Sequence, residues 1–188
     1  MIDLIFAVML ASTQPAAPTP PICVLTQKDK EANALLSFQE FDQNGTSPSS
    51  WRALGEQGCW QQAVEALQHY SINGPVAQPR EQRIMLFHLG QSLAISGEER
   101  RAADFIAFSR EPKGLRPPEN TLNWNDYVTG TWAFLVKDKS LLMRSRDAVL
   151  AAPGNGNNIN GNVLAGLARC FDKPYSVAYN PATGCQTE

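Results

Sequence analysis

The 188-residue chain lacks an excess of either charge, because 16 Lys and Arg stand against 18 Asp and Glu for a formal net charge of -2. A protein that binds nucleic acid by neutralising phosphates normally has a basic excess or a basic stripe. The sequence has neither, so we expect no nucleic-acid partner. The low-complexity composition typical of disorder is also missing, and 43% of the residues are hydrophobic. These proportions indicate one ordinary globular domain.

Long apolar runs are absent too, since no stretch approaches the roughly 18 apolar residues that suggest a membrane-spanning helix. The shorter apolar segment from Met1 to Ala11 precedes the proline-rich sequence STQPAAPTPP. This order is typical of a secretory leader and a linker. We therefore predict a signal peptide and Pro-rich linker over residues 1–21 and a single all-α repeat-like domain over residues 22–188. The protein is expected to be periplasmic or secreted, with no stable membrane span in the mature chain; the alternative is an unprocessed N-terminus packed on the fold.

Histidine and catalytic motifs are scarce. The two histidines, His69 and His88, have no H-E-x-x-H or other ligand spacing, so we predict neither a metal site nor a cofactor. No G-x-S-x-G elbow or reactive-cysteine signature is present. We therefore predict that the protein is not an enzyme. A Ser-His-Asp set assembled from distant residues would make it a small hydrolase, which is the least favoured alternative.

The four cysteines are an even set without a C-x-x-C pair, which fits an exported protein with disulfides. Four cysteines allow three pairings. We favour Cys170 with Cys185, which would staple the irregular tail to the last helix, and Cys23 with Cys59, which would join the N-terminal segment to the first helical turns. Closing a loop of about 15 residues stabilises a fold by about 3 kcal/mol in the chain-entropy picture. The alternative is four free buried thiols in a cytosolic protein.

Helical patterns follow one another along the rest of the chain. Apolar residues recur at helical spacing between glycine and proline breaks, and alternating strand patterns are missing. The first helix opens with Thr26 and Asp29, which resemble a capping pair. We predict an all-α fold with about eight helices.

An internal repeat is the most informative pattern. A shift of 39 residues superposes four positions with equal gaps in each copy: Leu54 on Leu93, Gly58 on Gly97, Ala63 on Ala102 and Leu67 on Ile106. The glycine permits a tight reversal, the alanine a close approach of two helices, and the large residue fills the gap between hairpins. A weaker third copy runs from Asn123 to Pro153.

This pattern resembles the tetratricopeptide-type helical hairpin, with Leu89-Gly90 on the first helix and Ala102 on the second. In the third copy Gly130 would take the role of Gly90, and Leu142 that of Ala102. The first copy has Trp51 where the second has Gly90, and Lys137 occupies the turn-glycine position of the third. The resemblance covers roughly residues 48–153. It implies a right-handed stack of helical hairpins, a tetratricopeptide-like α-solenoid.

In such a stack the first helix of each hairpin lines a concave groove, where a protein or peptide can bind. The resemblance implies these groove residues: Ile84, Phe87, Gln91 and Ile95 in the second copy, and Trp124, Tyr127, Thr131 and Phe134 in the third. An aromatic stripe at helical spacing is nevertheless more often core than groove. Arg80 and Arg83 at the mouth of the groove could hold a carboxylate, although exposed arginines seldom act so specifically.

The sequence therefore predicts a non-catalytic exported binding or assembly module that recognises an unidentified protein or peptide. The alternative from another class is a periplasmic small-molecule or cell-wall glycan binder, with Trp124 as a platform on which a sugar ring stacks. A protein-binding groove predicts an exposed apolar patch, and a glycan site predicts one aromatic residue ringed by Asn and Asp.

Overall fold

The computed structural model describes residues 22–75, 78–112 and 122–186. Helices are the only regular secondary structure in these ranges, which confirms the all-α prediction. The predicted leader and linker lie outside the described residues. None of the described helices is both long and apolar enough to cross a membrane.

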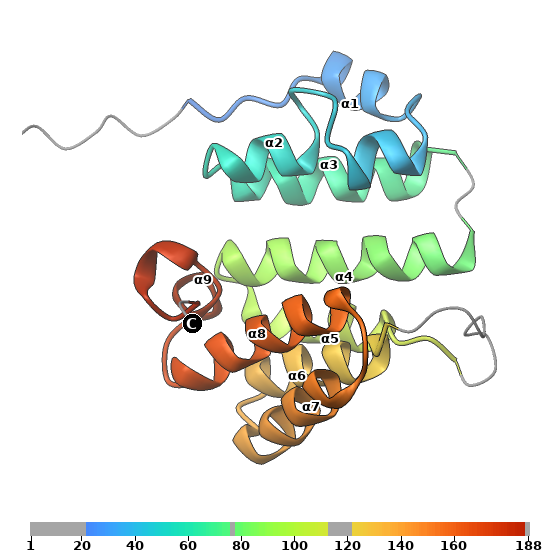
Figure 1. The fold of residues 1–188 in the computed structure, drawn as a ribbon. Helices are drawn as coiled ribbons and strands as arrows, with labels where there is room; N and C mark the ends of the chain where they lie inside the picture. Colours follow the sequence, from blue (N-terminus) through green and yellow to red (C-terminus); the bar gives the residue numbers. More distant parts are fainter. Residues whose placement is uncertain (1–21, 76–77, 113–121, 187–188) are drawn as a thin grey trace, which may run out of the picture.

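The described elements are helices and single helical turns that follow one another along the chain (Figure 1). They are α1 (Gln27–Asn33), the π-helical turn η1 (Gln39–Gln43), α2 (Trp51–Glu56), α3 (Trp60–Asn73), α4 (Pro79–Ile95), α5 (Glu99–Phe108), α6 (Trp124–Leu135), α7 (Lys139–Ala151), α8 (Asn155–Arg169), α9 (Tyr175–Ala178) and the 3-10 turn η2 (Pro181–Thr183).

Each helix from α2 to α8 packs against its neighbour in the chain, and α6 also packs against α8. The long helix α4 lies between α1–α3 on one side and α5–α8 on the other (Figure 1). The tail returns to the C-terminal end of α4, where α9 packs against both α4 and α8. The C-terminal tail is therefore brought back to a helix from the middle of the chain.

Three of the helix turns share one backbone conformation. Each contains a residue with positive φ, namely Gly58 at 79°, Gly97 at 97° and Lys137 at 61°. In each turn the next backbone N–H donates to a carbonyl five residues earlier at 2.8 Å: Cys59 to Leu54, Glu98 to Leu93 and Asp138 to Ala133. This bond satisfies a carbonyl that the helix end leaves without an intrahelical partner. The turn is thus kept even where Lys137 replaces glycine.

Helices α4 and α5 approach closely beside Ala102, as the sequence predicts, and the missing side chain of Gly90 permits this approach. A Cβ atom at Gly90 would lie 2.7 Å from Ile106 Cδ1 and 3.2 Å from the carbonyl oxygen of Ala102. The third copy differs from the prediction, because a Cβ at Gly130 would meet Leu164 of α8 at 2.7 Å and Ser145 of α7 at 3.1 Å. Leu142 is fully buried. Gly130 thus admits a side chain of a third helix instead of a close contact with Leu142.

Both disulfides have the pairing that the sequence favours. Cys23 bonds Cys59 with a Cα–Cα distance of 5.4 Å, and Cys170 bonds Cys185 with a distance of 5.8 Å. The first disulfide ties the N-terminal segment to the residue that precedes α3, and the second closes the segment that contains α9 and η2. The predicted capping pair is also present, since Thr26 and Asp29 form a reciprocal capping box at α1.

Candidate functional site

The proposed groove residues lie mostly inside the protein, which corrects their interpretation as an open binding surface. Ile84 is half-buried against the core, and Ile95 is also partly buried. The exposed fractions of the other six side chains are small: Phe87 2%, Gln91 7%, Trp124 8%, Tyr127 6%, Thr131 1% and Phe134 0%. Helical spacing of aromatic residues is the same for a core face and a groove face, so the sequence alone could not separate them.

Contacts between α4 and α6 explain this burial. The ring of Phe87 lies 5.1 Å from the rings of both Trp124 and Tyr127, centroid to centroid. The indole N–H of Trp124 donates to the Ser109 carbonyl at 2.9 Å, so its only polar group is satisfied internally. Phe134 packs edge-on against Tyr175 of α9 at 5.7 Å. These aromatic side chains join α4, α6 and the tail, and Trp124 offers no free face for a sugar.

A cavity lies elsewhere, where α2 and the start of α3 face the C-terminal part of α4 and the tail. Its volume is about 750 Å³, within the range of roughly 300–1,000 Å³ typical of small-ligand sites. Its wall consists of Trp51, Arg52, Gly55, Glu56, Gly58, Trp60, Gln91, Ile95, Ser176, Tyr179, Asn180 and Pro181. Gln91 and Ile95 are the wall residues that belong to the predicted groove.

A ring of four side chains supports the α2 wall. The buried Asp42 carboxylate pairs with His88 Nδ1 at 2.8 Å, and the Asp42 carbonyl accepts a hydrogen bond from Arg52 Nε at 2.5 Å. Arg52 lies over the Trp51 ring with its guanidinium carbon 4.4 Å from the ring centroid, and the Trp51 and His88 ring centroids are 4.8 Å apart. These contacts link η1, α2 and α4, and they hold Trp51 and Arg52 in fixed positions.

Gly55 positions the second tryptophan of the wall. A Cβ atom at Gly55 would lie 2.7 Å from Cη2 of Trp60, so the indole packs directly on the backbone of α2. Trp60 remains only half-buried and lines the cavity. The absence of a side chain at Gly55 therefore determines where this aromatic surface lies.

The tail supplies the opposite wall through Tyr179. Its ring stacks on Tyr175 with centroids 5.3 Å apart and planes 12° from parallel. The Tyr175 hydroxyl accepts a hydrogen bond from Gln91 Nε2 of α4 at 3.1 Å. Burial raises the pKa of Tyr179 and raises the pKa of Tyr175 well above its ordinary value. Both phenols are therefore neutral at physiological pH.

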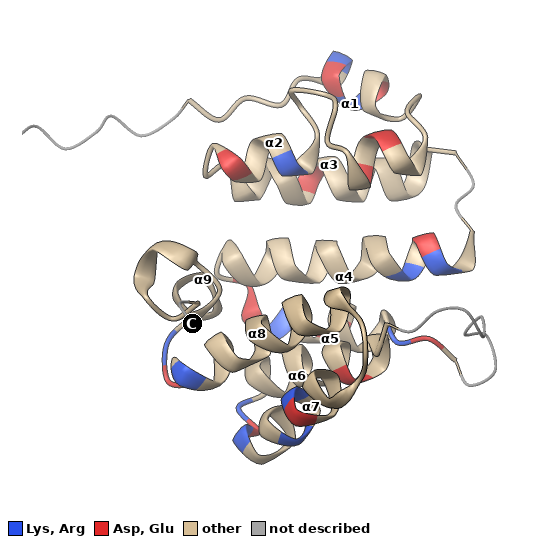
Figure 2. Cartoon of the chain, in the orientation of Figure 1, with Lys and Arg blue, Asp and Glu red and all other residues tan. Residues whose placement is uncertain are grey.

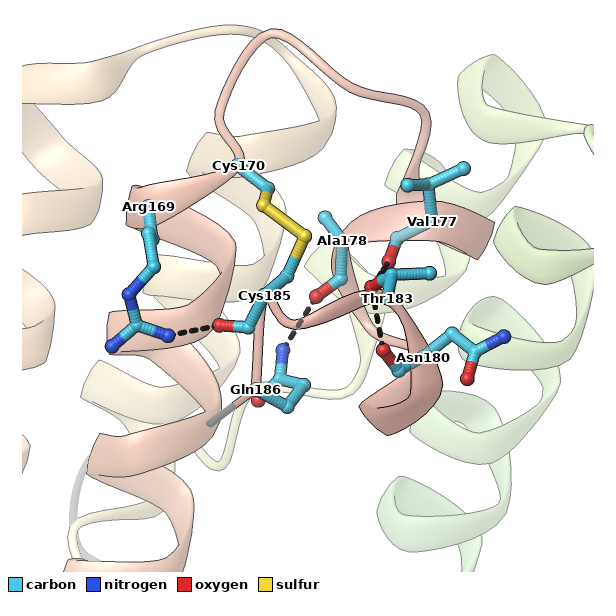
Figure 3. Close-up of a disulfide and its surroundings, with 8 residues drawn as sticks. All are labelled: Arg169, Cys170, Val177, Ala178, Asn180, Thr183, Cys185 and Gln186. Carbon is cyan, nitrogen blue, oxygen red and sulfur yellow. Dashed lines mark hydrogen bonds between the residues drawn. A yellow bond between two sulfur atoms is a disulfide. The ribbon is translucent and has the colours of Figure 1, made fainter. Parts of the chain in front are cut away.

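The disulfide between Cys170 and Cys185 holds this tail in place, and side-chain hydrogen bonds reinforce it (Figure 3). Arg169 donates to the Cys185 carbonyl, and Gln186 donates to the Ala178 carbonyl at 2.6 Å. The Thr183 hydroxyl contacts the carbonyls of Val177 and Asn180 at 2.8 and 2.7 Å. The cavity wall formed by α9 and η2 is thus a closed and internally bonded unit.

Two of the described wall residues of the cavity are charged, Arg52 and Glu56, and both belong to α2. Each of the other α-helices carries at least one charged residue, whereas α9 carries none (Figure 2). The cavity wall contains neither histidine nor cysteine. Across the described parts of the chain, no cluster of three or more His, Cys, Asp and Glu is placed to hold a metal ion.

A smaller cavity of about 270 Å³ is lined in part by Arg80 and Arg83, the two arginines that the sequence predicts at the mouth of the groove. Arg80 Nε lies 3.8 Å from Glu111 Oε1, and Arg83 Nη1 donates to the Phe108 carbonyl at 2.7 Å. Both side chains therefore already contact acceptors of the protein itself.

No protein-family model, curated protein or solved structure matches the chain. The candidate site therefore depends on its own geometry. Sequence reasoning did not identify Trp51, Trp60 and Tyr179 as wall residues. One signal was present: Trp51 occupies the position that Gly90 and Gly130 occupy in the other copies.

Proposed function

We propose that the protein is a non-catalytic exported binding module that holds a segment of a protein or peptide in the cavity between α2, α4 and the tail. One observation carries this proposal: three partly or fully buried aromatic residues, Trp51, Trp60 and Tyr179, line the same cavity of about 750 Å³. Rigid aromatic side chains provide large apolar contact area and lose little rotamer freedom on binding.

The wall is also organised before a ligand arrives. Trp51 is fixed by His88 and Arg52, Trp60 rests on Gly55, and Tyr179 stacks on Tyr175. Side chains that are already held in place do not pay their ordering entropy at the moment of binding. This rigidity favours a binding role over a purely structural one.

We also propose that the helices form a tetratricopeptide-like right-handed stack. Its support is the common conformation of the turns at Gly58, Gly97 and Lys137, together with the close approach of Gly90 to Ala102. Export to the periplasm or beyond is proposed on the apolar segment at residues 1–11 and the two disulfides.

The test is a selection of random peptides displayed on phage against the folded protein, followed by calorimetric titration of the enriched peptides. We expect Trp60→Ala to weaken their binding by about tenfold or more, since a buried aromatic anchor contributes on the order of 2 kcal/mol. Trp132→Ala is the matched control, because Trp132 is also half-buried but lies on α6 outside the cavity wall. Enrichment of no peptide, or equal loss of binding in both variants, would contradict the proposal.

A glycan is the second candidate, and one observation favours it. The partly exposed ring of Tyr179 is accompanied in the wall by three polar side chains, Gln91, Ser176 and Asn180. Sugar rings stack on aromatic faces while their hydroxyls bond to such polar groups. Titration with peptidoglycan fragments distinguishes the candidates: binding of these fragments, lost in Tyr179→Ala, in a protein that enriches no peptide would favour the glycan.

A further inference from the structure

Arg52 differs from the ordinary surface arginine because its side chain is fixed. Its Nε donates to the Asp42 carbonyl, and its guanidinium lies over the Trp51 ring. The Asp42 carbonyl is itself held, since the Asp42 side chain is buried and paired with His88. The guanidinium is therefore held at the cavity wall before any ligand binds.

The guanidinium of Arg52 has no carboxylate partner among the described residues. None of the ion pairs between described residues includes Arg52, so no described carboxylate oxygen lies within 4.0 Å of its nitrogens. The described hydrogen bonds use its Nε but neither terminal nitrogen. A guanidinium with free terminal N–H groups can bind a carboxylate with two parallel hydrogen bonds.

Arg52 of α2 and Tyr179 of the tail line the same cavity. Burial raises the pKa of Tyr179, and the Gln91 hydrogen bond and the Arg52 charge act in the opposite direction. The positive charge of Arg52 therefore acts on the Tyr179 phenol of the tail. Glu56 is the one acidic wall residue, and it is exposed while Arg52 is half-buried. Solvent screens the exposed charge more strongly, so the cavity favours an anionic group.

We propose that the cavity selects a peptide segment in which one carboxylate lies beside an apolar side chain. The carboxylate binds the terminal nitrogens of Arg52, and the apolar side chain contacts Trp60 and Tyr179. This inference rests on the proposed peptide-binding function and adds the chemistry of the ligand. The carboxylate comes either from an acidic side chain or from the end of a peptide chain.

Three probes separate these sources. The first is acetyl-Gly-Gly-Glu-Phe-Gly-Gly-amide, the second has Gln in place of Glu, and the third is acetyl-Gly-Gly-Gln-Phe with a free terminal carboxylate. Their affinities are measured by calorimetry and by the change in tryptophan fluorescence, to which the wall residues Trp51 and Trp60 contribute. We expect the first or the third probe to bind about tenfold more tightly than the second, the size of one charge-assisted hydrogen-bonded pair. The difference should shrink at high salt.

Variants assign the preference to Arg52. Arg52→Gln should reduce the affinity ratio to about one, and Arg52→Lys should keep part of it because the charge remains without the planar fork. Arg144→Gln is the matched control, because Arg144 is exposed on α7 and bonds only to Ser140 among the described residues. Circular dichroism checks that each variant is helical. If Arg52→Gln does not fold, the affinity ratio of the carboxylate probes to the Gln probe in the parent, and its salt dependence, still test the carboxylate selection.

The outcomes separate the two proposals. Equal binding of all three probes to the parent, or an unchanged ratio in folded Arg52→Gln, overturns the carboxylate selection and leaves peptide binding standing. Binding of no probe, with no peptide enriched by phage selection, overturns both. Preference for the side-chain or for the terminal carboxylate supports the selection and identifies its source.

Discussion

The pair formed by α2 and α3 and the pair formed by α4 and α5 have the same turn but different interiors. Seven residues before the turn glycine, the first pair has Trp51 and the second has Gly90. Gly90 lets Ile106 and the backbone at Ala102 fill the space beside it. Trp51 instead lines a cavity and is held by contacts from η1 and α4. At equivalent positions, the second pair thus has a glycine packed against its partner helix, and the first has a tryptophan that contacts α4 and lines the cavity.

The largest expected effect comes from breaking the contacts that hold Trp51. His88→Ala removes one of the two side-chain partners of the fully buried Asp42 carboxylate and leaves the hydrogen bond from Gln43 Nε2. A hydrogen bond to a charged group contributes about 1.5–3 kcal/mol. We therefore expect the free energy of unfolding, measured by urea titration, to fall by about this amount.

His88→Asn is the matched variant, because its amide can still donate to Asp42. It should recover part of the loss. Equal stability of the parent and His88→Ala would mean that the Asp42 pair does not support the α2 wall.

A smaller effect is expected from closing the space beside Gly90. Gly90→Ala places a methyl group 2.7 Å from Ile106 Cδ1 and 3.2 Å from the Ala102 carbonyl. Overpacking typically costs about 1–3 kcal/mol, and the better helix propensity of alanine returns up to about 1 kcal/mol. We expect a net loss of about 1–2 kcal/mol in urea unfolding. Adding Ile106→Val should restore part of it, whereas a more stable Gly90→Ala would contradict the close approach.

The smallest effect is confined to alkaline pH and concerns two buried tyrosines, Tyr70 of α3 and Tyr175 of α9. Burial raises the pKa of Tyr70 to about 12 and raises the pKa of Tyr175 well above its ordinary value. The folded chain keeps phenolic protons that the unfolded chain releases above a pH of about 10. The stability that depends on these neutral phenols is fully present below a pH of about 10, and it is lost as the pH rises through the pKa values of the folded chain.

Urea unfolding over a range from neutral pH to about 12 measures this loss. Tyr175→Phe cannot ionise at that position, so its stability should fall less steeply above a pH of about 10. At neutral pH it should lose only about 1 kcal/mol for the missing Gln91 hydrogen bond. The same alkaline slope in both proteins would exclude Tyr175 as a contributor.

Local patterns predicted the features that local physics determines. The capping box at Thr26, both disulfide pairings and the close approach of two helices beside Ala102 are confirmed, because each depends on a short sequence signal or on few alternatives. The cavity was not predicted. Its wall joins α2, α4 and the tail, and helical periodicity does not specify which apolar face meets which distant segment. The same limit explains why Trp124 and Tyr127 were expected in a groove and are buried in the core.

The closed tail also has a consequence for the order of folding. Neighbouring helix pairs depend on contacts close in sequence, which form quickly, whereas the Gln91 bond to Tyr175 joins residues 84 positions apart. The cavity is therefore completed only after the tail has reached α4, and the Cys170–Cys185 bond shortens the segment that must search for that position. A ligand seated there would bridge early-forming and late-forming parts of the chain, so its binding would report the completion of folding.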